Sequence, residues 1–370
     1  MSKYWNNRVK KINPYTPGEQ PKDRKFIKLN TNENPYPPSL KVIEAVKNAA
    51  NADLRLYPDP SSTAFREAAA VRYNVKPEQV FAGNGSDEIL AFAFGAFFEN
   101  ANGAVNSGED TIIFPDITYS FYPVYADLWR IPYRTVLLRE DFSINCDDYK
   151  TRCGGVIFPN PNAPTGIPIP LSDIVSIAEY LDAQGRVLIV DEAYCAFGYG
   201  NGKAIGTSSV PYIEKHQNLL TVHTMSKQMS LAGLRFGFAI GSEELIEGLY
   251  RIKDSFNSYP IDRLALAGAT AAVTDAAYFD DINRKVMATR ERVAGELQAL
   301  GFNVLPSAAN FLFIQTPDIH GAELFAKLRE RGILVRHFNK ERISDFLRVT
   351  IGTDEEMDVF LGACKEIITS

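Results

Sequence analysis

Short apolar runs and longer amphipathic stretches alternate along the middle of the chain. The apolar runs, rich in β-branched residues, lie at 79–83, 110–116, 154–160, 186–194 and 219–227. Apolar residues at helical spacing follow the first three runs, at 86–98, 119–128 and 171–184. This alternation is typical of a mainly parallel sheet with helices on both faces, because parallel strands need a crossover between them. We therefore predict an α/β fold for a large domain in this part of the chain.

The two ends of the chain follow a different pattern. A helix-prone stretch at 264–300 ends at Gly301, and alternating runs follow at 310–315, 332–338 and 346–352. With helices expected at 321–331 and 355–368, these runs predict a smaller α+β domain. Pro- and Asn-rich segments at 13–21 and 30–39 should be extended loop along the surface or the domain cleft. The expected division is an N-terminal arm with part of the small domain at 1–44, the large domain at 45–255 and the small C-terminal domain at 256–370.

Composition excludes several classes of protein. With 370 residues, of which 45% are apolar and 23% charged, the chain has the size of about two domains and the balance of a globular protein. Its 39 basic and 45 acidic residues give a net charge of −6 without a long basic block, which argues against nucleic acid as a partner. No apolar stretch reaches the roughly 20 residues of a membrane-spanning helix, so we expect no membrane partner.

Cysteine and histidine usage sets further limits. The four cysteines have no Cys-x-x-Cys spacing, so neither a disulfide framework nor a zinc site is expected, and a reducing cytosol fits best. The four histidines lie far apart in the sequence, so we expect no metal. Because the polar N-terminus lacks the apolar core of a signal peptide, the predicted location is cytoplasmic.

Polar residues follow several of the predicted strands, where ligands bind in open parallel sheets. Gly85, Ser86 and Asp87 come after the first run and open a helix, so their N–H groups and the helix dipole could receive an anion such as phosphate. A simple helix cap by Ser86 is the alternative. The dinucleotide-binding fingerprint is excluded, because Glu88 stands at its third glycine position.

Asp191 and Lys227 are the strongest candidates for chemistry. Asp191 directly follows a buried-type run, where a carboxylate is costly without a cationic partner or hydrogen bonds; a turn or helix-cap aspartate is the alternative. Lys227 has small and apolar neighbours, which predict a partly buried amine with the lowered pKa that a Schiff base requires; a solvated lysine is the alternative. Arg235 could pair with a phosphate, and Tyr194 alone could be a packed aromatic.

Taken together, these residues resemble a known family. Gly85-Ser86-Asp87, the Pro-Asn-Ala-Pro-Thr-Gly run at 161–166, Asp191 to Tyr194, and Ser226-Lys227 with Arg235 are similar to the motifs of fold type I aminotransferases, which use pyridoxal 5′-phosphate. Lys227 follows Asp191 by 36 residues, a separation similar to that of the family. The resemblance extends from 32–35 to 347–352 and implies a fold type I architecture with a large cofactor-binding domain.

The resemblance implies a role toward the cofactor for each of these residues. Lys227 would bond to its aldehyde, Asp191 would keep its pyridine nitrogen protonated, and Tyr119 would stack on its ring. Tyr194 and Asn162 would contact the 3′ oxygen. The residues implied around its phosphate are Gly85, Ser86, Asp87, Ser226 and Arg235.

Two implied contacts carry further consequences. The family usually has a second asparagine for the 3′ oxygen, and Ala163 stands there in this chain, so that either Asn162 takes over the contact or the oxygen depends on Tyr194. Tyr57 is similar to a tyrosine that reaches the cofactor phosphate of the neighbouring subunit, which implies a homodimer.

Closer similarity points to the substrate. Arg348 resembles the arginine that binds the α-carboxylate of an amino acid, with a surface strand arginine as the alternative. The histidinol-phosphate aminotransferase family has features similar to Tyr15, Arg336 and the loop that contains Asn34. The resemblance implies that Tyr15, Asn34 and Arg336 bind the substrate. Tyr15 and Arg336 would contact the substrate phosphate, although Tyr15 could also be a packed aromatic.

The implied reaction transfers an amino group. It interconverts L-histidinol phosphate plus 2-oxoglutarate and imidazole-acetol phosphate plus L-glutamate, and it is a step of histidine biosynthesis. Lys227, Asp191 and Tyr119 would be its catalytic residues, and small amino acids and keto acids its partners. An aromatic or aspartate aminotransferase and a threonine-phosphate decarboxylase stay open as alternatives. A cofactor-binding regulatory relative is the non-enzymatic alternative, against which the intact Lys227 and Asp191 count.

Overall fold

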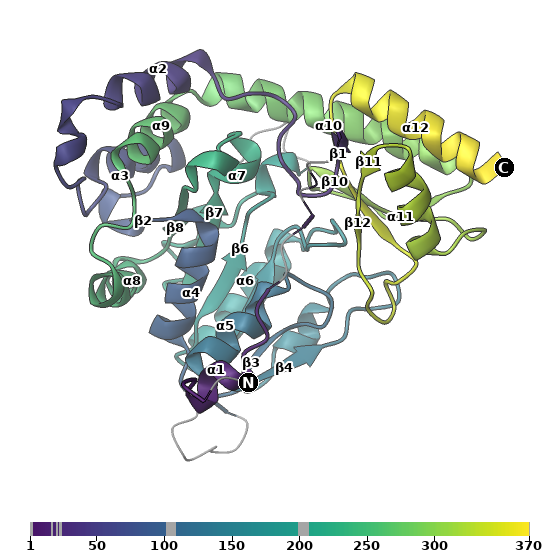
Figure 1. The fold of residues 1–370 in the computed structure, drawn as a ribbon. Helices are drawn as coiled ribbons and strands as arrows, with labels where there is room; N and C mark the ends of the chain where they lie inside the picture. The colour runs from purple at the N-terminus through teal and green to yellow at the C-terminus, as the bar shows by residue number, and fades with distance from the viewer. Residues whose placement is uncertain are drawn as a thin grey trace.

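The computed structural model describes residues 3–15, 18–19, 21, 24–100, 109–198 and 207–369. Residues 16, 17 and 20 of the opening segment that we expect to be loop lie outside these ranges. Within them the chain forms a seven-stranded sheet, a four-stranded sheet and a two-stranded sheet, with helices packed around them (Figure 1). None of the helices in the described ranges is long and apolar enough to cross a membrane.

The seven-stranded sheet confirms the predicted α/β fold. Its order is β2-β8-β7-β6-β5-β3-β4, and only β8 runs antiparallel to its neighbours. The strands are β2 (Val80–Gly83), β3 (Ile112–Pro115), β4 (Tyr133–Val136), β5 (Gly155–Pro159), β6 (Leu188–Asp191), β7 (Leu219–Thr224) and β8 (Gly237–Ile240). Of these, β4 and β8 are not among the predicted strands; β4 is a largely exposed edge strand, whereas β8 is a buried four-residue strand like β2.

Helices cover both faces of this sheet, because side chains alternate along each strand. Ile112 and Phe114 of β3 belong to one core, and Ile113 between them belongs to the other. The first core is completed by α4 (Gly85–Phe97), α5 (Phe121–Trp129) and α8 (Glu243–Phe256). The second is completed by α2 (Leu40–Ala49), α3 (Thr63–Tyr73), α6 (Leu171–Asp182) and α9 (Arg263–Thr274). Because both faces are covered, the strand ends are where the sheet can present polar groups to a ligand.

A second set of elements brings the two ends of the chain together. The four-stranded antiparallel sheet has the order β12-β13-β10-β9, and the two-stranded sheet pairs β1 with β11 in parallel. The strands are β1 (Ile27–Lys28), β9 (Asn303–Val304), β10 (Phe311–Gln315), β11 (Ile333–Leu334), β12 (Arg336–His337) and β13 (Leu347–Thr350). The helices that pack here are α10 (Ala276–Ala299), α11 (Gly321–Glu330) and α12 (Asp354–Thr369).

Two predicted elements are divided in the structure. The stretch 264–300 forms two helices, α9 and α10, which meet at Asp275. The run 332–338 is shared by β11 and β12, which pair in different sheets. The helix α9 packs on α2 and α3 and therefore lies with the large sheet. The domain boundary expected at 255/256 stays a prediction.

Several short helices complete the fold. The first α-helix, α1 (Asn7–Lys11), lies near the N-terminus, and α7 (Met225–Gln228) directly follows β7. Single 3₁₀ turns lie at Ala52–Arg55, Pro77–Gln79, Cys146–Tyr149, Cys195–Phe197, Val210–Tyr212 and Ala232–Leu234.

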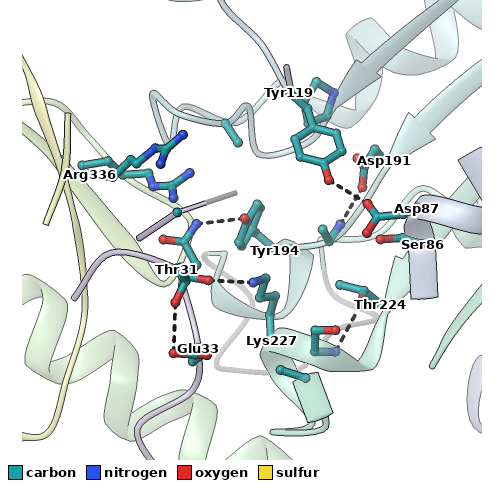
Figure 2. Close-up of a pocket in the computed structure, with 18 of the residues that line it drawn as sticks. Thr31, Glu33, Ser86, Asp87, Tyr119, Asp191, Tyr194, Thr224, Lys227 and Arg336 are labelled. Carbon is teal, nitrogen blue, oxygen red and sulfur yellow. Dashed lines mark hydrogen bonds between the residues drawn. The ribbon is translucent and has the colours of Figure 1, made fainter. Parts of the chain in front are cut away.

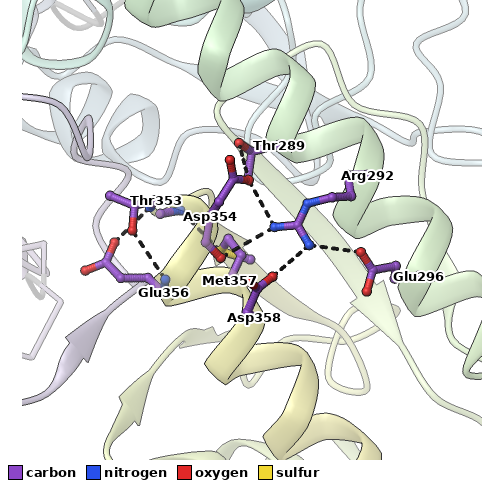
Figure 3. A network of polar contacts seen from close by, with 9 residues as sticks. Thr289, Arg292, Glu296, Thr353, Asp354, Glu356, Met357 and Asp358 are labelled. Carbon is purple, nitrogen blue, oxygen red and sulfur yellow. Dashed lines mark hydrogen bonds and ion pairs between the residues drawn. The ribbon is translucent and has the colours of Figure 1, made fainter.

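A polar network joins α10 to the start of α12 (Figure 3). Arg292 of α10 donates to Asp354 at 3.0 Å, to Asp358 at 2.8 Å and to Glu296 at 2.9 Å. Thr289 donates to the same carboxylate of Asp354 at 3.0 Å. Glu296 lies on α10 itself, so two of these carboxylates, Asp354 and Asp358, join α10 to α12. Exposed ion pairs of this kind contribute little singly.

Candidate active site

A cavity of about 420 Å³ lies where three parallel strands of the main sheet end. Pro159, Asp191 and Thr224, the last residues of β5, β6 and β7, line it. The segment after β1 and the strands β12 and β13 line it from the opposite side. The cavity therefore occupies the carboxyl edge of the sheet, where open parallel sheets bind their ligands.

Most of the predicted site residues line this one cavity. Figure 2 shows Ser86, Asp87, Tyr119 and Asp191 on one side of Lys227, and Arg336 on the other. The predicted residues that line it are Tyr15, Ser86, Asp87, Tyr119, Asp191, Tyr194, Ser226, Lys227, Arg235, Arg336 and Arg348. The fold thus gathers side chains that are spread over most of the sequence.

Three other predicted residues lie outside the lining. Gly85 opens α4 with a φ of +77°, a left-handed conformation that favours glycine, and it lies against the end of the Arg235 side chain. Asn34 lies beneath the cavity and donates its side-chain amide to the carbonyl of Lys227 at 3.0 Å. Tyr57 is 78% exposed and stacks on Tyr259 away from the cavity.

Asn162 also lies outside the lining, whereas Ala163 contributes to it. The Asn162 amide is buried and donates to the carbonyl of Ile117 at 3.0 Å and to the Thr165 hydroxyl at 3.1 Å. Its implied contact with a cofactor oxygen stays a prediction. This geometry favours the other alternative, in which Tyr194 supplies that contact.

Lys227 is held at the centre of the cavity by the first turn after β7. Its Nζ donates to the backbone carbonyl of Thr31 at 3.0 Å (Figure 2). Burial, and after it the positive charge of Arg348, lowers the pKa of the Lys227 amine to about 8. A large fraction of this amine is therefore neutral and nucleophilic in mildly alkaline solution.

Asp191 ends β6 and is only 4% exposed. Its carboxylate accepts hydrogen bonds from the Ala193 N–H and the Tyr122 hydroxyl, both at 3.2 Å. Burial raises its pKa to about 7, and within the described ranges no lysine, arginine or histidine forms an ion pair with it. A buried carboxylate in this state favours a ligand that brings a cationic N–H group, such as a protonated pyridine.

The start of α4 and the turn after β7 form an anion site. Ser86 stands in the first turn of α4, where N–H groups and the helix dipole attract negative charge. The Ser226 hydroxyl is buried and has no hydrogen-bond partner among the described residues. Arg235 is the nearby cation, and its guanidinium reaches Asp87 at 3.0 Å. These groups fit a phosphate, which would satisfy both the hydroxyl and the helix terminus.

Asp87 also orders the aromatic side of the cavity. Its second oxygen accepts a hydrogen bond from the Tyr119 hydroxyl at 2.7 Å. Burial, together with the charge of Asp87, raises the pKa of Tyr119 well above its usual value, so the hydroxyl stays protonated. Tyr119 is therefore fixed beside Asp191 with its ring in the cavity lining, as a stacking residue has to be.

The opposite side of the cavity carries two arginines. Arg348 donates to the carbonyl of Asn30 at 3.1 Å, and its Nε is buried without a partner among the described residues. Burial and the charge of Arg336 both lower the pKa of Arg348, so the two guanidinium groups lie close enough to repel. Tyr15 completes this side and stacks on Phe121 at 4.4 Å. Two close cations at a cavity wall favour a ligand with an anionic group at this end.

Sequence reasoning missed several residues of the site. Tyr122 bonds Asp191 from a predicted helix, and Thr31, Asn32 and Glu33 line the cavity from a segment predicted as loop. Thr31 holds Lys227 through its backbone carbonyl, which no sequence motif could indicate. The available signal was the Asn-rich composition of the loop, which predicted its place at the cleft but not its contacts.

A buried polar cluster lies behind the cavity. Glu192, Cys195 and His223 place ligand-type atoms within 4.8 Å of one another, the one such group in the described part of the chain. The Glu192 carboxylate already accepts hydrogen bonds from the hydroxyls of Ser208 and Ser209. Burial lowers the pKa of His223 to about 3, so its ring is neutral. These bonds anchor the segment that carries Asp191 and Tyr194.

Comparison with known proteins gives a consistent result. The family model for aminotransferase class I and II matches residues 24–363. The chain is 54% identical over 368 residues to the histidinol-phosphate aminotransferase of Clostridium acetobutylicum, and the match covers 100% of both proteins.

Solved structures share the fold. The histidinol-phosphate aminotransferase of Sinorhizobium meliloti in complex with pyridoxal-5′-phosphate has a TM-score of 0.87 at 22% identity, over 100% of this chain and 98% of that one. A mutant aspartate aminotransferase of Thermus thermophilus has a TM-score of 0.82 at 20% identity, over 99% of this chain and 100% of that one. At such identities the likeness concerns the fold and leaves the substrate open.

The lowered pKa of Lys227 predicts an unusual pH dependence of its reactivity. In the cofactor-free protein, acylation of Lys227 by acetic anhydride should rise through a midpoint near pH 8, because the neutral amine is the reactive form. Lys76 is the internal control, since its ion pair with Glu243 raises its pKa and moves its midpoint upward. Arg348→Gln should raise the Lys227 midpoint by removing a repelling charge. Peptide mass spectrometry measures the midpoints of Lys227, of Lys76 and of Lys227 in the Arg348→Gln variant. Equal midpoints for the two lysines would contradict the prediction.

Proposed function

Since the chain belongs to the family of class I and class II aminotransferases, we propose that it is a pyridoxal-phosphate-dependent histidinol-phosphate aminotransferase. It would convert L-histidinol phosphate and 2-oxoglutarate to imidazole-acetol phosphate and L-glutamate, with glutamate as the amino donor in the biosynthetic direction. The observation that carries the proposal is that one cavity holds a neutralisable lysine, a buried carboxylate, a phosphate-type site and two further arginines. Full-length identity of 54% to a histidinol-phosphate aminotransferase supports the choice of substrate.

The residues present fit the cofactor at both of its ends. The unpartnered Ser226 hydroxyl and the start of α4 suit its phosphate, and the unpaired carboxylate of Asp191 suits its pyridine nitrogen. When bound, pyridoxal 5′-phosphate supplies an aldehyde for the amine and a ring that withdraws electrons from the substrate α-carbon. Asp191 strengthens that withdrawal by keeping the ring nitrogen protonated. Tyr119 would hold the ring in place.

Lys227 would be both the attachment point and the proton carrier. Its Nζ would take the proton from the substrate α-carbon and would hold it for return in a later step. A pKa near 8 suits both tasks, because the group exchanges protons readily at neutral to mildly alkaline pH. The Thr31 carbonyl, which accepts a hydrogen bond from Nζ, would orient the amine between these steps.

The arginine side of the cavity suits the two substrates. Arg336 and Tyr15 would bind the phosphate of L-histidinol phosphate, and Arg348 would bind the α-carboxylate of glutamate. Both substrates carry an anionic group that a guanidinium can bind, so one cavity with two guanidinium groups can serve them in turn. The aromatic or aspartate alternative would not need a phosphate contact at Arg336.

The proposed substrate can be tested with single-turnover spectroscopy of the loaded enzyme. L-histidinol phosphate, L-phenylalanine and O-phospho-L-threonine are mixed with it separately, and loss of the absorption band of the lysine-bound cofactor is followed. We expect fast loss with L-histidinol phosphate. Fast loss with phenylalanine and none with histidinol phosphate would refute the proposal, and release of CO₂ from phosphothreonine would favour the decarboxylase.

The phosphate contact of Arg336 can be tested separately. Arg336→Ala should raise KM for L-histidinol phosphate by about 10- to 100-fold, since a charge-assisted hydrogen bond contributes roughly 1.5 to 3 kcal/mol. KM for glutamate should change much less. Arg331→Ala, at an arginine outside the cavity lining, is the matched control. Equal changes for both substrates would argue against a phosphate site at Arg336.

We also propose that the chain works as a homodimer in which Tyr57 completes the neighbouring site. Tyr57 is 78% exposed and outside the cavity lining, so its role toward the cofactor phosphate requires a second chain. A mixture of Tyr57→Ala and Lys227→Ala chains should regain tight cofactor binding in half of the sites of mixed dimers. Light scattering measures the mass, and cofactor titration the binding. A monomer, or no regained binding, would exclude this arrangement.

A further inference from the structure

The cavity lacks a side-chain amide where the family resemblance expects one. Ala163 presents only a methyl group to the cavity. The side-chain amide of the neighbouring Asn162 donates instead to the Ile117 carbonyl and the Thr165 hydroxyl. Tyr194 would then be the remaining donor to the oxygen on the cofactor ring. A lone hydroxyl can rotate its proton away from that oxygen, so the direction of the Tyr194 proton becomes decisive.

Asn32 supplies an amide to Tyr194 from the other side of the cavity. Its Nδ2 donates to the Tyr194 hydroxyl oxygen at 2.9 Å, which is the dashed line on Tyr194 in Figure 2. Asn32 is 1% exposed and lines the cavity. Its backbone has a φ of +55°, a left-handed conformation that asparagine adopts more easily than most residues. The residue is therefore held in a special conformation at the place where its amide meets Tyr194.

Contacts with Thr350 and Asn310 fix which way the Asn32 amide points. The Thr350 hydroxyl accepts the Asn32 backbone N–H at 2.9 Å and donates to Asn32 Oδ1 at 3.0 Å. Asn310 donates to the Asn32 carbonyl at 3.0 Å. With Oδ1 engaged by Thr350, the NH₂ group of Asn32 is the side that faces Tyr194.

The Tyr194 hydroxyl is consequently a donor toward the cavity. Its oxygen accepts from Asn32, so its own proton is available for another acceptor. The Tyr194 ring packs edge-on against Phe311 of β10 at 5.1 Å, which limits its movement. Burial, with Asp191 and Tyr15 nearby, raises the pKa of Tyr194 against the opposing charge of Arg348, and the hydroxyl keeps its proton at neutral pH.

We propose that Asn32 is a positioning residue that compensates for the missing amide at Ala163. By donating to the Tyr194 oxygen, it directs the Tyr194 proton to the ring oxygen of the cofactor, and Thr350 holds Asn32 in the orientation that does so. This inference rests on the proposed cofactor and deepens its account of the ring oxygen. Asn32 acts through Tyr194 and is not itself a catalytic residue.

The consequence concerns the proton that the lysine-bound cofactor shares between its nitrogen and its ring oxygen. A donor on that oxygen stabilises its anion and so lowers the pH at which the chromophore loses its proton. Weakening the donor raises that pH. The visible absorption band of the loaded enzyme reports this titration directly and needs no turnover.

The test is a pH titration of that band in Asn32→Gly, which removes the amide and keeps the left-handed backbone free of strain. We expect the midpoint to rise by about one pH unit, the size of one modest hydrogen bond to a charged group. Asn32→Asp should raise it at least as much, because a carboxylate accepts the Tyr194 proton. Thr350→Val should give a smaller rise. Asn74→Gly is the matched control, since Asn74 has the same φ of +55° at the exposed end of α3 and should leave the midpoint unchanged.

A double variant separates positioning from a general structural effect. In a Tyr194→Phe background, Asn32→Gly should cause no further rise, because the route through the hydroxyl is already removed. Equal rises in both backgrounds, or an unchanged midpoint in the single variants, overturn the proposal. If the unaltered protein shows no lysine-bound band, the proposed cofactor itself is wrong. An intact band with substrate-dependent loss, but no shift in the Asn32 variants, refutes this inference alone. Melting curves of each loaded variant establish that it is folded.

Discussion

The burial of two ionisable groups, Asp191 and Lys227, at the ends of neighbouring strands is the constraint on which this site depends. Burial raises the pKa of the acid to about 7 and lowers that of the amine to about 8. Burying either group alone in its charged form costs free energy. A ligand that pairs the acid with a cationic nitrogen and bonds to the amine relieves both costs. The free-energy cost of burying these two residues is thus a reason for the cavity to bind a cofactor tightly.

The sheet explains why these two groups meet. In the parallel pair β6 and β7, Asp191 is in register with Val222, and Lys227 lies in α7, which begins three residues later at Met225. The antiparallel strand β8 returns after that helix, so Arg235 reaches the start of α4. Gly237 makes this approach possible, because a Cβ there would lie 2.6 Å from the Ser86 nitrogen. The contacts proposed for the cofactor therefore depend on local sheet geometry and short turns.

This locality explains what could be predicted from the sequence. The residues at strand ends and helix starts, such as Ser86, Asp191 and Lys227, were recognisable because their motifs are contiguous and each strand has a clear apolar run. The largely exposed edge strand β4 lacks that signal, whereas the buried β8 has it and is still absent from the prediction. The break between α9 and α10 lies at Asp275 without a proline or glycine. Asn32 could not be predicted, because its role depends on Thr350, which is 318 residues away in the sequence.

The substrate side of the cavity is built in a different way. Arg336 and Arg348 belong to β12 and β13, and they meet the segment after β1, whose Asn30 carbonyl holds Arg348 at 3.1 Å. These contacts join the two ends of the chain, and the network around Arg292 links α10 to α12. The cofactor residues, by contrast, lie on the central sheet and its turns. Substitutions in the terminal segments can alter which anionic substrate is accepted, although those at Thr31, Asn32 or Arg348 also act on Lys227 or Tyr194. A shared fold among aminotransferases of different substrates is the expected result of this separation.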